Sequence, residues 1–183
     1  MVNAYFANVQ PHVVAESTNL LGTTYGRHIF NIKASADIDN GKLVNLDGMV
    51  WQANEYFTMV EPTATSRVGL ILSVPVGPDS TPYAATLESN FYNAQNEIMR
   101  VYDLVRGDKF TISDNGIKKR TTGSGSSTTD VPVAVGDYVI ADGYDIADAG
   151  TSTPSNKTFV GQVVEKIVRT NGVFWKIVVR AND

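Results

Sequence analysis

The chain has 183 residues, a formal net charge of −4 and no cysteine. A unit of this length can bury about 70% of the surface that its unfolded chain exposes, so its fold requires neither disulfides nor a structural metal. The lack of cysteine excludes thiol catalysis, zinc ribbons and iron–sulfur clusters, and the negative charge disfavours general binding to nucleic acid.

The amino-terminal segment predicts an arm rather than a leader. Its sequence, MVNAYFANVQPH, lacks the basic start and the apolar core of a signal peptide. Apolar runs such as Val68–Val76 are far shorter than the roughly 20 residues of a membrane helix. We therefore expect a soluble protein with an extended arm over residues 1–26, ordered by a partner surface or by its own core, and a β-rich body over residues 27–183.

Asx-Gly pairs are the strongest turn signals in the body. Asparagine, aspartate and glycine tolerate the positive φ that a type I′ hairpin turn needs at both central positions. The chain has five such pairs: Asn40-Gly41, Asp47-Gly48, Asn115-Gly116, Asp142-Gly143 and Asn171-Gly172. Closely spaced turns of this kind predict an antiparallel β fold.

Short apolar or alternating runs between these turns predict the strands. The expected strands before the last hairpin are Arg27–Lys33, Leu43–Leu46, Val68–Val74, Val101–Val105, Lys109–Ser113 and Tyr138–Ala141. Val68–Val74 is apolar on both faces, which indicates a strand that is covered on both sides.

One helix is expected near Tyr83–Asn96. Ser80-Thr81-Pro82 offers a cap followed by proline at the first helical position, and Leu87, Phe91, Ala94 and Ile98 recur at helical spacing. Two segments with small polar residues, Thr121–Asp130 and Ala147–Lys157, predict flexible loops.

The carboxyl-terminal segment predicts a hairpin. Phe159–Arg169 and Val173–Arg180 flank the pair Asn171-Gly172. In the second strand, Val173, Trp175, Ile177 and Val179 share one face, so Trp175 is expected to be a core anchor.

An internal repeat relates the two ends of the body. Ala36–Gly48 aligns without gaps to Val131–Gly143, and Val68–Val74 parallels Val160–Lys166. The repeat predicts two similar β units, residues 27–78 and 131–183, with the helix, further strands and the first flexible loop in residues 79–130. Coincidence among glycine turns is the alternative. The expected fold is mainly β, with compact β-barrel or sandwich-like units.

Groups that carry chemistry are sparse. His12 and His28 have no carboxylate or cysteine at metal-ligand spacing, and the carboxylate pairs Asp37/Asp39 and Asp145/Asp148 are expected to bond their own turns. A serine triad need not be close in sequence, but the chain has no Gly-x-Ser-x-Gly motif. We therefore expect no catalytic residue, no metal and no cofactor, with a hydrolase as a minor alternative.

Two further motifs have an ordinary and a functional interpretation. Lys118-Lys119-Arg120 is expected to be a solvated hairpin end, and contact with an acidic partner is the alternative. Arg106-Gly107-Asp108 spells an adhesion tripeptide, but the same Gly-Asp start occurs at Gly136-Asp137, so a structural turn is favoured.

Three stretches resemble bacteriophage proteins. DIDNGKLVNLDGMVW, followed by VGLILSVPV, resembles the rhythm of small head decoration (cement) proteins of tailed phages, and NAQNEIMRVYDLVRGDKFTIS resembles their auxiliary capsid proteins. The resemblance implies a non-enzymatic virion protein, made in the host cytoplasm, that binds the major capsid protein lattice on the capsid exterior. It also implies a homo-oligomer, with a trimer favoured. A fibre or baseplate adhesin is the alternative.

Overall fold

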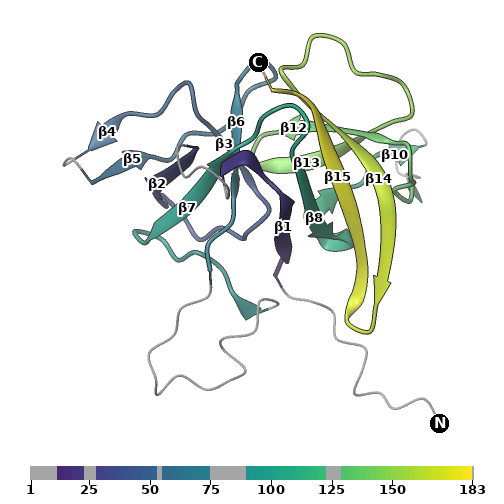
Figure 1. Cartoon of the computed structure of the whole chain (residues 1–183), viewed down its shortest axis with the longest axis horizontal. Helices are drawn as coiled ribbons and strands as arrows, with labels where there is room; N and C mark the ends of the chain where they lie inside the picture. Colours follow the sequence, from purple (N-terminus) through teal and green to yellow (C-terminus); the bar gives the residue numbers. More distant parts are fainter. Residues whose placement is uncertain (1–11, 23–27, 53–54, 75–89, 123–128, 183) are drawn as a thin grey trace.

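The computed structural model describes residues 12–22, 28–52, 55–74, 90–122 and 129–182. Two β-sheets dominate it, so the mainly β, sandwich-like fold is confirmed (Figure 1). The six-stranded sheet has the order β3-β6-β7-β2-β5-β4, and the seven-stranded sheet has the order β1-β8-β15-β14-β12-β13-β9. Neighbouring strands are antiparallel except in the pairs β2–β5 and β13–β9.

The six-stranded sheet comes from one continuous part of the chain. Its strands are β2 (Ile29–Lys33), β3 (Leu43–Asn45), β4 (Trp51–Gln52), β5 (Tyr56–Thr58), β6 (Val68–Ile71) and β7 (Ile98–Asp103). All four residues of β6 are buried, as the apolar run predicts, because β6 has a core cluster on each face.

The seven-stranded sheet joins the amino-terminal strand to the second half of the chain. Its strands are β1 (Ala15–Asn19), β8 (Lys109–Ser113), β9 (Ile117–Lys118), β12 (Tyr138–Asp142), β13 (Asp145–Gly150), β14 (Phe159–Arg169) and β15 (Gly172–Asn182). β10 (Thr121–Thr122) and β11 (Thr129–Asp130) form a separate two-stranded sheet. These short strands are the ends of the predicted loop Thr121–Asp130, and residues 123–128 lie outside the described residues.

Two hydrophobic clusters form the core. The larger cluster lies between the sheets, because it combines Val68 and Leu70 of β6 with Phe110, Trp175 and residues of the other strands of the seven-stranded sheet. The smaller cluster lies on the opposite face of the six-stranded sheet and includes Ile71.

The predicted carboxyl-terminal hairpin is confirmed, with a correction to its turn. β14 and β15 pair from Phe159↔Asn182 to Arg169↔Gly172, so Thr170 and Asn171 form the turn. Gly172 has a φ of 139°, whereas Asn171 does not have a positive φ. The type I′ expectation is wrong at each of the five Asx-Gly pairs, because the Asx residue never has a positive φ and the glycine alone supplies it where one is needed.

The segments of the predicted repeat pair in the same register. Val44 faces Gly69 in β3–β6, and Val139 faces Gly161 in β12–β14. The turns before these strands match as well. The Gly41 N–H donates to the Ile71 carbonyl at 2.8 Å, and the Gly136 N–H donates to the Val163 carbonyl at 2.8 Å. The two β pairs therefore share this register and this turn hydrogen bond.

Two sequence predictions need correction. Of the predicted helix Tyr83–Asn96, residues 83–89 lie outside the described residues, Asn90 has 3-10 geometry, and residues 91–96 are not helical. There Asn93 forms an isolated bridge with Ile38, and Asn96 has a φ of 72°. The predicted loop Ala147–Lys157 begins inside β13, where Asp148 is 6% exposed.

The described part of the predicted arm belongs to the body. Residues 1–11 and 23–26 lie outside the described residues, but Ala15–Asn19 form β1 beside β8. Val13, Val14 and Leu20 are buried. The chain's own core therefore orders this segment, which is one of the two possibilities that the sequence leaves open.

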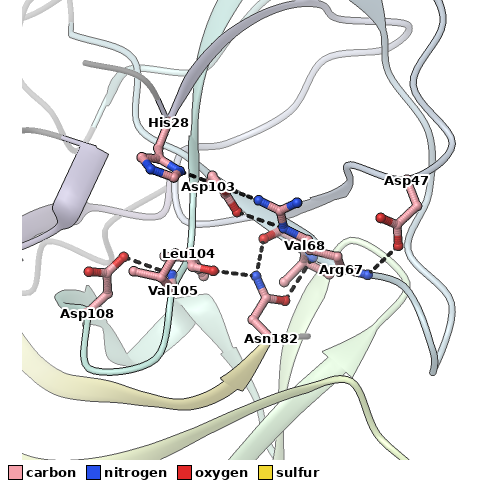
Figure 2. Close-up of polar contacts among 9 residues, drawn as sticks. All are labelled: His28, Asp47, Arg67, Val68, Asp103, Leu104, Val105, Asp108 and Asn182. Carbon is pink, nitrogen blue, oxygen red and sulfur yellow. Dashed lines mark hydrogen bonds and ion pairs between the residues drawn. The ribbon is translucent and has the colours of Figure 1, made fainter. Parts of the chain in front are cut away.

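One buried side chain joins the two sheets. Asn182, at the end of β15, accepts a hydrogen bond from the Val68 N–H at 2.9 Å and donates to the carbonyls of Val68 and Leu104 at 2.8 and 2.6 Å (Figure 2). Asn182 is 2% exposed. These bonds attach the seven-stranded sheet to the start of β6 and to the residue that follows β7.

Candidate functional site

An aromatic row reaches the free edge of the six-stranded sheet. We use this name for Phe30 of β2, Phe57 of β5 and Trp51 of β4. The ring centroids of Phe30 and Phe57 lie 5.8 Å apart, and those of Phe57 and Trp51 lie 4.5 Å apart, both in edge-on geometry. Such pairs contribute about 0.5–1.5 kcal/mol beyond the area that they bury.

The aromatic row connects the smaller core cluster to solvent. Phe30 and Phe57 pack against that cluster, whereas Trp51 is 48% exposed and its neighbour Val50 is 56% exposed. β4 is the last strand of its sheet and projects at the left of Figure 1. An exposed tryptophan whose ring contacts a neighbouring aromatic ring can provide a large contact area to another protein at a low entropic cost. The sequence did not single out Trp51, because exposure at a sheet edge has no local signal.

A buried carboxylate connects His28 and Arg67. Asp103 is 1% exposed, lies 3.0 Å from His28 Nδ1, and accepts hydrogen bonds from the Arg67 guanidinium (Figure 2). In a serine triad, an aspartate orients a histidine in this way. Here the same carboxylate is also shared with Arg67, and no other hydrogen bond to the His28 ring is found among the described residues. The arrangement supports a structural ion-pair cluster that connects the residues immediately before β2 and β6 to β7.

The second histidine also contacts a distant aspartate. His12 Nδ1 lies 2.8 Å from Asp39, which accepts a further hydrogen bond from the Val13 N–H at 3.2 Å. The His12 ring stacks on Tyr92 with 5.1 Å between the ring centroids. These contacts hold the chain immediately before β1 against the loop that contains Asp39.

The four carboxylates expected to bond their own turns behave in two ways. Asp148 does so, because its Oδ1 accepts from the Gly150 N–H at 2.8 Å. Asp37, Asp39 and Asp145 instead bond distant residues: the Gln95 N–H, the Val13 N–H and the Lys42 ammonium. The expectation of local turn bonding is therefore wrong for these three residues, which connect distant segments of the chain.

The basic triplet is paired within the chain. Lys118 contacts Asp142 at 2.5 Å, Lys119 contacts Asp114 at 2.8 Å, and Arg120 lies 3.2 Å from Asp148. Each basic side chain therefore has its own carboxylate, which reduces the charge offered to an acidic partner. The triplet lines a hollow of about 360 Å³ beside β9, β12 and β13.

Two carboxyl groups near this hollow have shifted pKa values. Burial raises the pKa of Asp148, with nearby Asp137 adding to the shift and the Gly150 N–H and Arg120 opposing it. Burial also disfavours the ionised form of Asp114, but hydrogen bonds from Lys119 and Trp175 outweigh it and lower the pKa of Asp114. The Trp175 indole donates to Asp114 at 2.8 Å, so this carboxylate connects β15 to the turn before β9.

The adhesion tripeptide is a structural turn. Asp108 is 5% exposed, and its carboxylate accepts from the Val105 and Leu21 N–H groups at 3.0 Å each. Asp137 accepts from the Ala134 N–H at 2.9 Å in the equivalent turn. The preceding glycines, Gly107 and Gly136, have φ values of 99° and 100°. Since the aspartate is committed to backbone groups, the tripeptide does not present it to a receptor.

Metal-binding and membrane-spanning features are absent from the part of the chain that the structure describes. No group of three or more histidine, cysteine, aspartate or glutamate residues that could hold a metal ion lies within the described ranges. Over the same residues, no helix has the length and apolar character needed to cross a membrane. Comparison of the chain with protein-family models, with curated proteins and with solved structures gives no match.

Proposed function

We propose that this chain is a non-enzymatic virion protein that binds the outside of a phage capsid and stabilises the head. The observation that carries the proposal is the aromatic row, in which Trp51 is held half-exposed at a sheet edge by its contact with Phe57. A protein that acts by binding needs rigid, accessible aromatic anchors, and few residues usually supply most of the binding energy.

The sequence resemblance supports the choice of partner. DIDNGKLVNLDGMVW, one of the stretches similar to head decoration proteins, ends on Trp51. The proposed partner is the major capsid protein lattice, and the proposed state of the bound protein is a trimer. Three linked contacts would act at high effective concentration and strengthen attachment without any new kind of contact.

Mass action explains how binding alone would stabilise a head. A ligand that binds only the assembled lattice stabilises it by about 2.7 kcal/mol per site when its concentration is a hundred times its Kd. Repeated over a shell, this contribution increases resistance to heat and to the pressure of the packaged genome.

The test is co-sedimentation of the purified protein with phage heads that lack their own decoration protein. We expect the full-length protein to sediment with heads and Trp51→Ala to bind at least about tenfold more weakly, as for a hot-spot tryptophan. Val168→Ala is the matched control, because Val168 is 74% exposed on β14 of the other sheet. Failure of the full-length protein to bind heads would contradict the proposal, and binding to tails instead would support the adhesin alternative.

A truncated variant tests whether the amino-terminal segment contributes to attachment. The truncation must end before His12, since Val13 and Val14 are buried and β1 pairs with β8. A chain that begins at His12 should keep the melting temperature of the full-length protein and bind heads more weakly. Equal binding by both forms would place the contact on the β body alone.

A further inference from the structure

The fold places three Asn-Gly pairs in three different environments. These pairs are Asn40-Gly41, Asn115-Gly116 and Asn171-Gly172. In such a pair the glycine nitrogen can attack the asparagine side-chain carbonyl, because glycine has no side chain to obstruct the approach. The reaction needs an accessible turn in which the backbone can rotate, so burial and hydrogen bonding should decide which pair reacts.

Asn40 is held at both reacting groups. It is 8% exposed, its Nδ2 donates to the Ser73 carbonyl at 2.8 Å, and its Oδ1 accepts from the Ser73 N–H at 2.9 Å. The attacking nitrogen is engaged as well, because the Gly41 N–H donates to the Ile71 carbonyl at 2.8 Å. Reaction at this pair would require these bonds to open together.

Asn115 is held by its turn and by the packing of its glycine. It lies in the 3-10 turn Asp114–Gly116, accepts a hydrogen bond from Ser113 Oγ at 2.6 Å and donates to the His12 carbonyl at 3.3 Å. Gly116 is buried, and a Cβ there would lie 2.6 Å from side chains of Ile112 and Val13. The backbone of this pair therefore has little room to rotate.

Asn171 lies in the two-residue turn at the end of the β14–β15 hairpin. Thr170, Asn171 and Gly172 are all exposed, and the closing pair Arg169↔Gly172 is the last of the ladder. The ends of hairpins open at a much lower cost than buried strands. Water and base therefore reach this pair more readily than Asn40-Gly41, which is buried. Asn115 is exposed as well, but its glycine is buried, so the backbone of that pair is more confined than that of Asn171-Gly172.

We propose that Asn171 is a site of spontaneous deamidation and isoaspartate formation. The Gly172 nitrogen bonds to Asn171 Cγ and gives its proton to solvent base, and the side-chain nitrogen leaves as ammonia, which closes a five-membered succinimide. Water then opens the ring at either carbonyl and leaves aspartate or isoaspartate. Water is the only co-reactant, and no electrons are exchanged.

The product changes the surface of the hairpin end. Isoaspartate adds a carbon to the main chain in a turn of two residues, and both products add a negative charge beside Arg169. The Arg169 guanidinium bonds Glu16 at 2.5 and 2.8 Å and lies 4.5 Å from the centre of the Phe174 ring. The new carboxylate would compete for this arginine and weaken the contact between β14 and β1.

The test is incubation of the folded protein at mildly alkaline pH, followed by peptide mass mapping. Deamidation raises a peptide's mass by about one dalton. We expect the peptide with Asn171 to convert at least about tenfold faster than the peptide with Asn40, because Asn40 must first open several hydrogen bonds. Isoaspartate is detected by methyl transfer from labelled S-adenosylmethionine by an isoaspartyl methyltransferase.

Matched variants and a denatured sample complete the experiment. Asn171→Ser should remove the dominant conversion, whereas Asn115→Ser should leave it unchanged. In denaturant the three pairs should convert at similar rates, since the fold no longer distinguishes them. Conversion of Asn40 or Asn115 as fast as Asn171 in the folded protein would overturn the proposal, as would methyl incorporation that persists unchanged in Asn171→Ser.

Discussion

Each of the two sheets contains a strand pair in which a valine faces a glycine, but the sheets place their tryptophans differently. Val44 faces Gly69 in one sheet and Val139 faces Gly161 in the other. The strands that carry the tryptophans occupy different places, since β4 is an edge strand and β15 lies between β8 and β14. Trp51 is consequently 48% exposed and Trp175 is 4% exposed. Local sequence can specify a strand pair, but the position of a strand in its sheet decides whether its residues become core or surface.

Replacing each tryptophan by alanine gives the largest test of this contrast. Trp175→Ala should lower the free energy of unfolding by about 3–5 kcal/mol, because it leaves a cavity in the larger core cluster. Trp51→Ala should lower it by only about 1 kcal/mol, the value of an exposed aromatic contact. Urea denaturation measures both changes, and equal losses would contradict the assignment of Trp51 to the surface.

The next test concerns the side chain that joins the sheets. Asn182→Ala should cost about 3 kcal/mol, since it leaves three buried backbone groups without a partner at roughly 1 kcal/mol or more each. Asn182→Asp keeps the acceptor and loses both donors. Urea denaturation at neutral pH should show a smaller loss for this variant than for Asn182→Ala only if the new charge is solvated. A loss below about 0.5 kcal/mol in both variants, within the range of ordinary surface substitutions, would show that the sheets are held together without this residue.

The two equivalent glycines provide a finer comparison. A Cβ at Gly69 would lie 2.5 Å from Val101 and 3.2 Å from the Tyr102 carbonyl, whereas a Cβ at Gly161 would lie 2.8 Å from two side-chain methyl groups. Gly69→Ala should therefore cost about 2 kcal/mol, and Gly161→Ala should cost less, because overpacking is relieved where side chains can move. Thermal unfolding, with Val164→Ala as a partly exposed control, would measure the loss of stability in each glycine variant. A larger loss in Gly161→Ala than in Gly69→Ala would contradict this explanation.

The smallest expected effect is a pH dependence in the seven-stranded sheet. The pKa of Asp114 is lowered below its ordinary value of 3.8 by Lys119 and Trp175. A lowered folded-state pKa contributes stability that is present above the unfolded pKa and is lost as pH falls through the folded one. The difference in unfolding free energy between the protein and Asp114→Asn should therefore shrink as pH falls below about 4. If this difference stays constant from pH 6 to about pH 2, the contribution of Asp114 to the free energy of unfolding does not depend on its charge.

The sequence predicted elements whose signals are local. The β14–β15 hairpin follows from residues that alternate along one segment, and its turn was displaced by a single residue because Gly172 takes the positive φ after the turn. The helix expected near Tyr83–Asn96 fails in its described part, where backbone hydrogen bonds between Asn93 and Ile38 hold the chain in an isolated bridge.

Contacts between distant residues were not predictable in the same way. His28 and Asp103 are 75 positions apart, and His12 and Asp39 are 27 apart. No periodicity relates such residues, so their pairing depends on how the strands are arranged. The candidate binding residue Trp51 was missed for the same reason, because its exposure depends on β4 being the last strand of its sheet.

The order of the strands along the chain has a consequence for synthesis on the ribosome. All strands of the six-stranded sheet lie between Ile29 and Asp103, so they can pair before the second half of the chain has been translated. β1 and β8 connect to the other strands of the seven-stranded sheet only through β15. Since β15 is the last strand to be synthesised, β1 and β8 cannot join that sheet earlier. Nascent chains stalled before Gly172 should therefore show protease protection over strands β2 to β7 and not over β1 or β8, because parts of a chain can fold while synthesis continues.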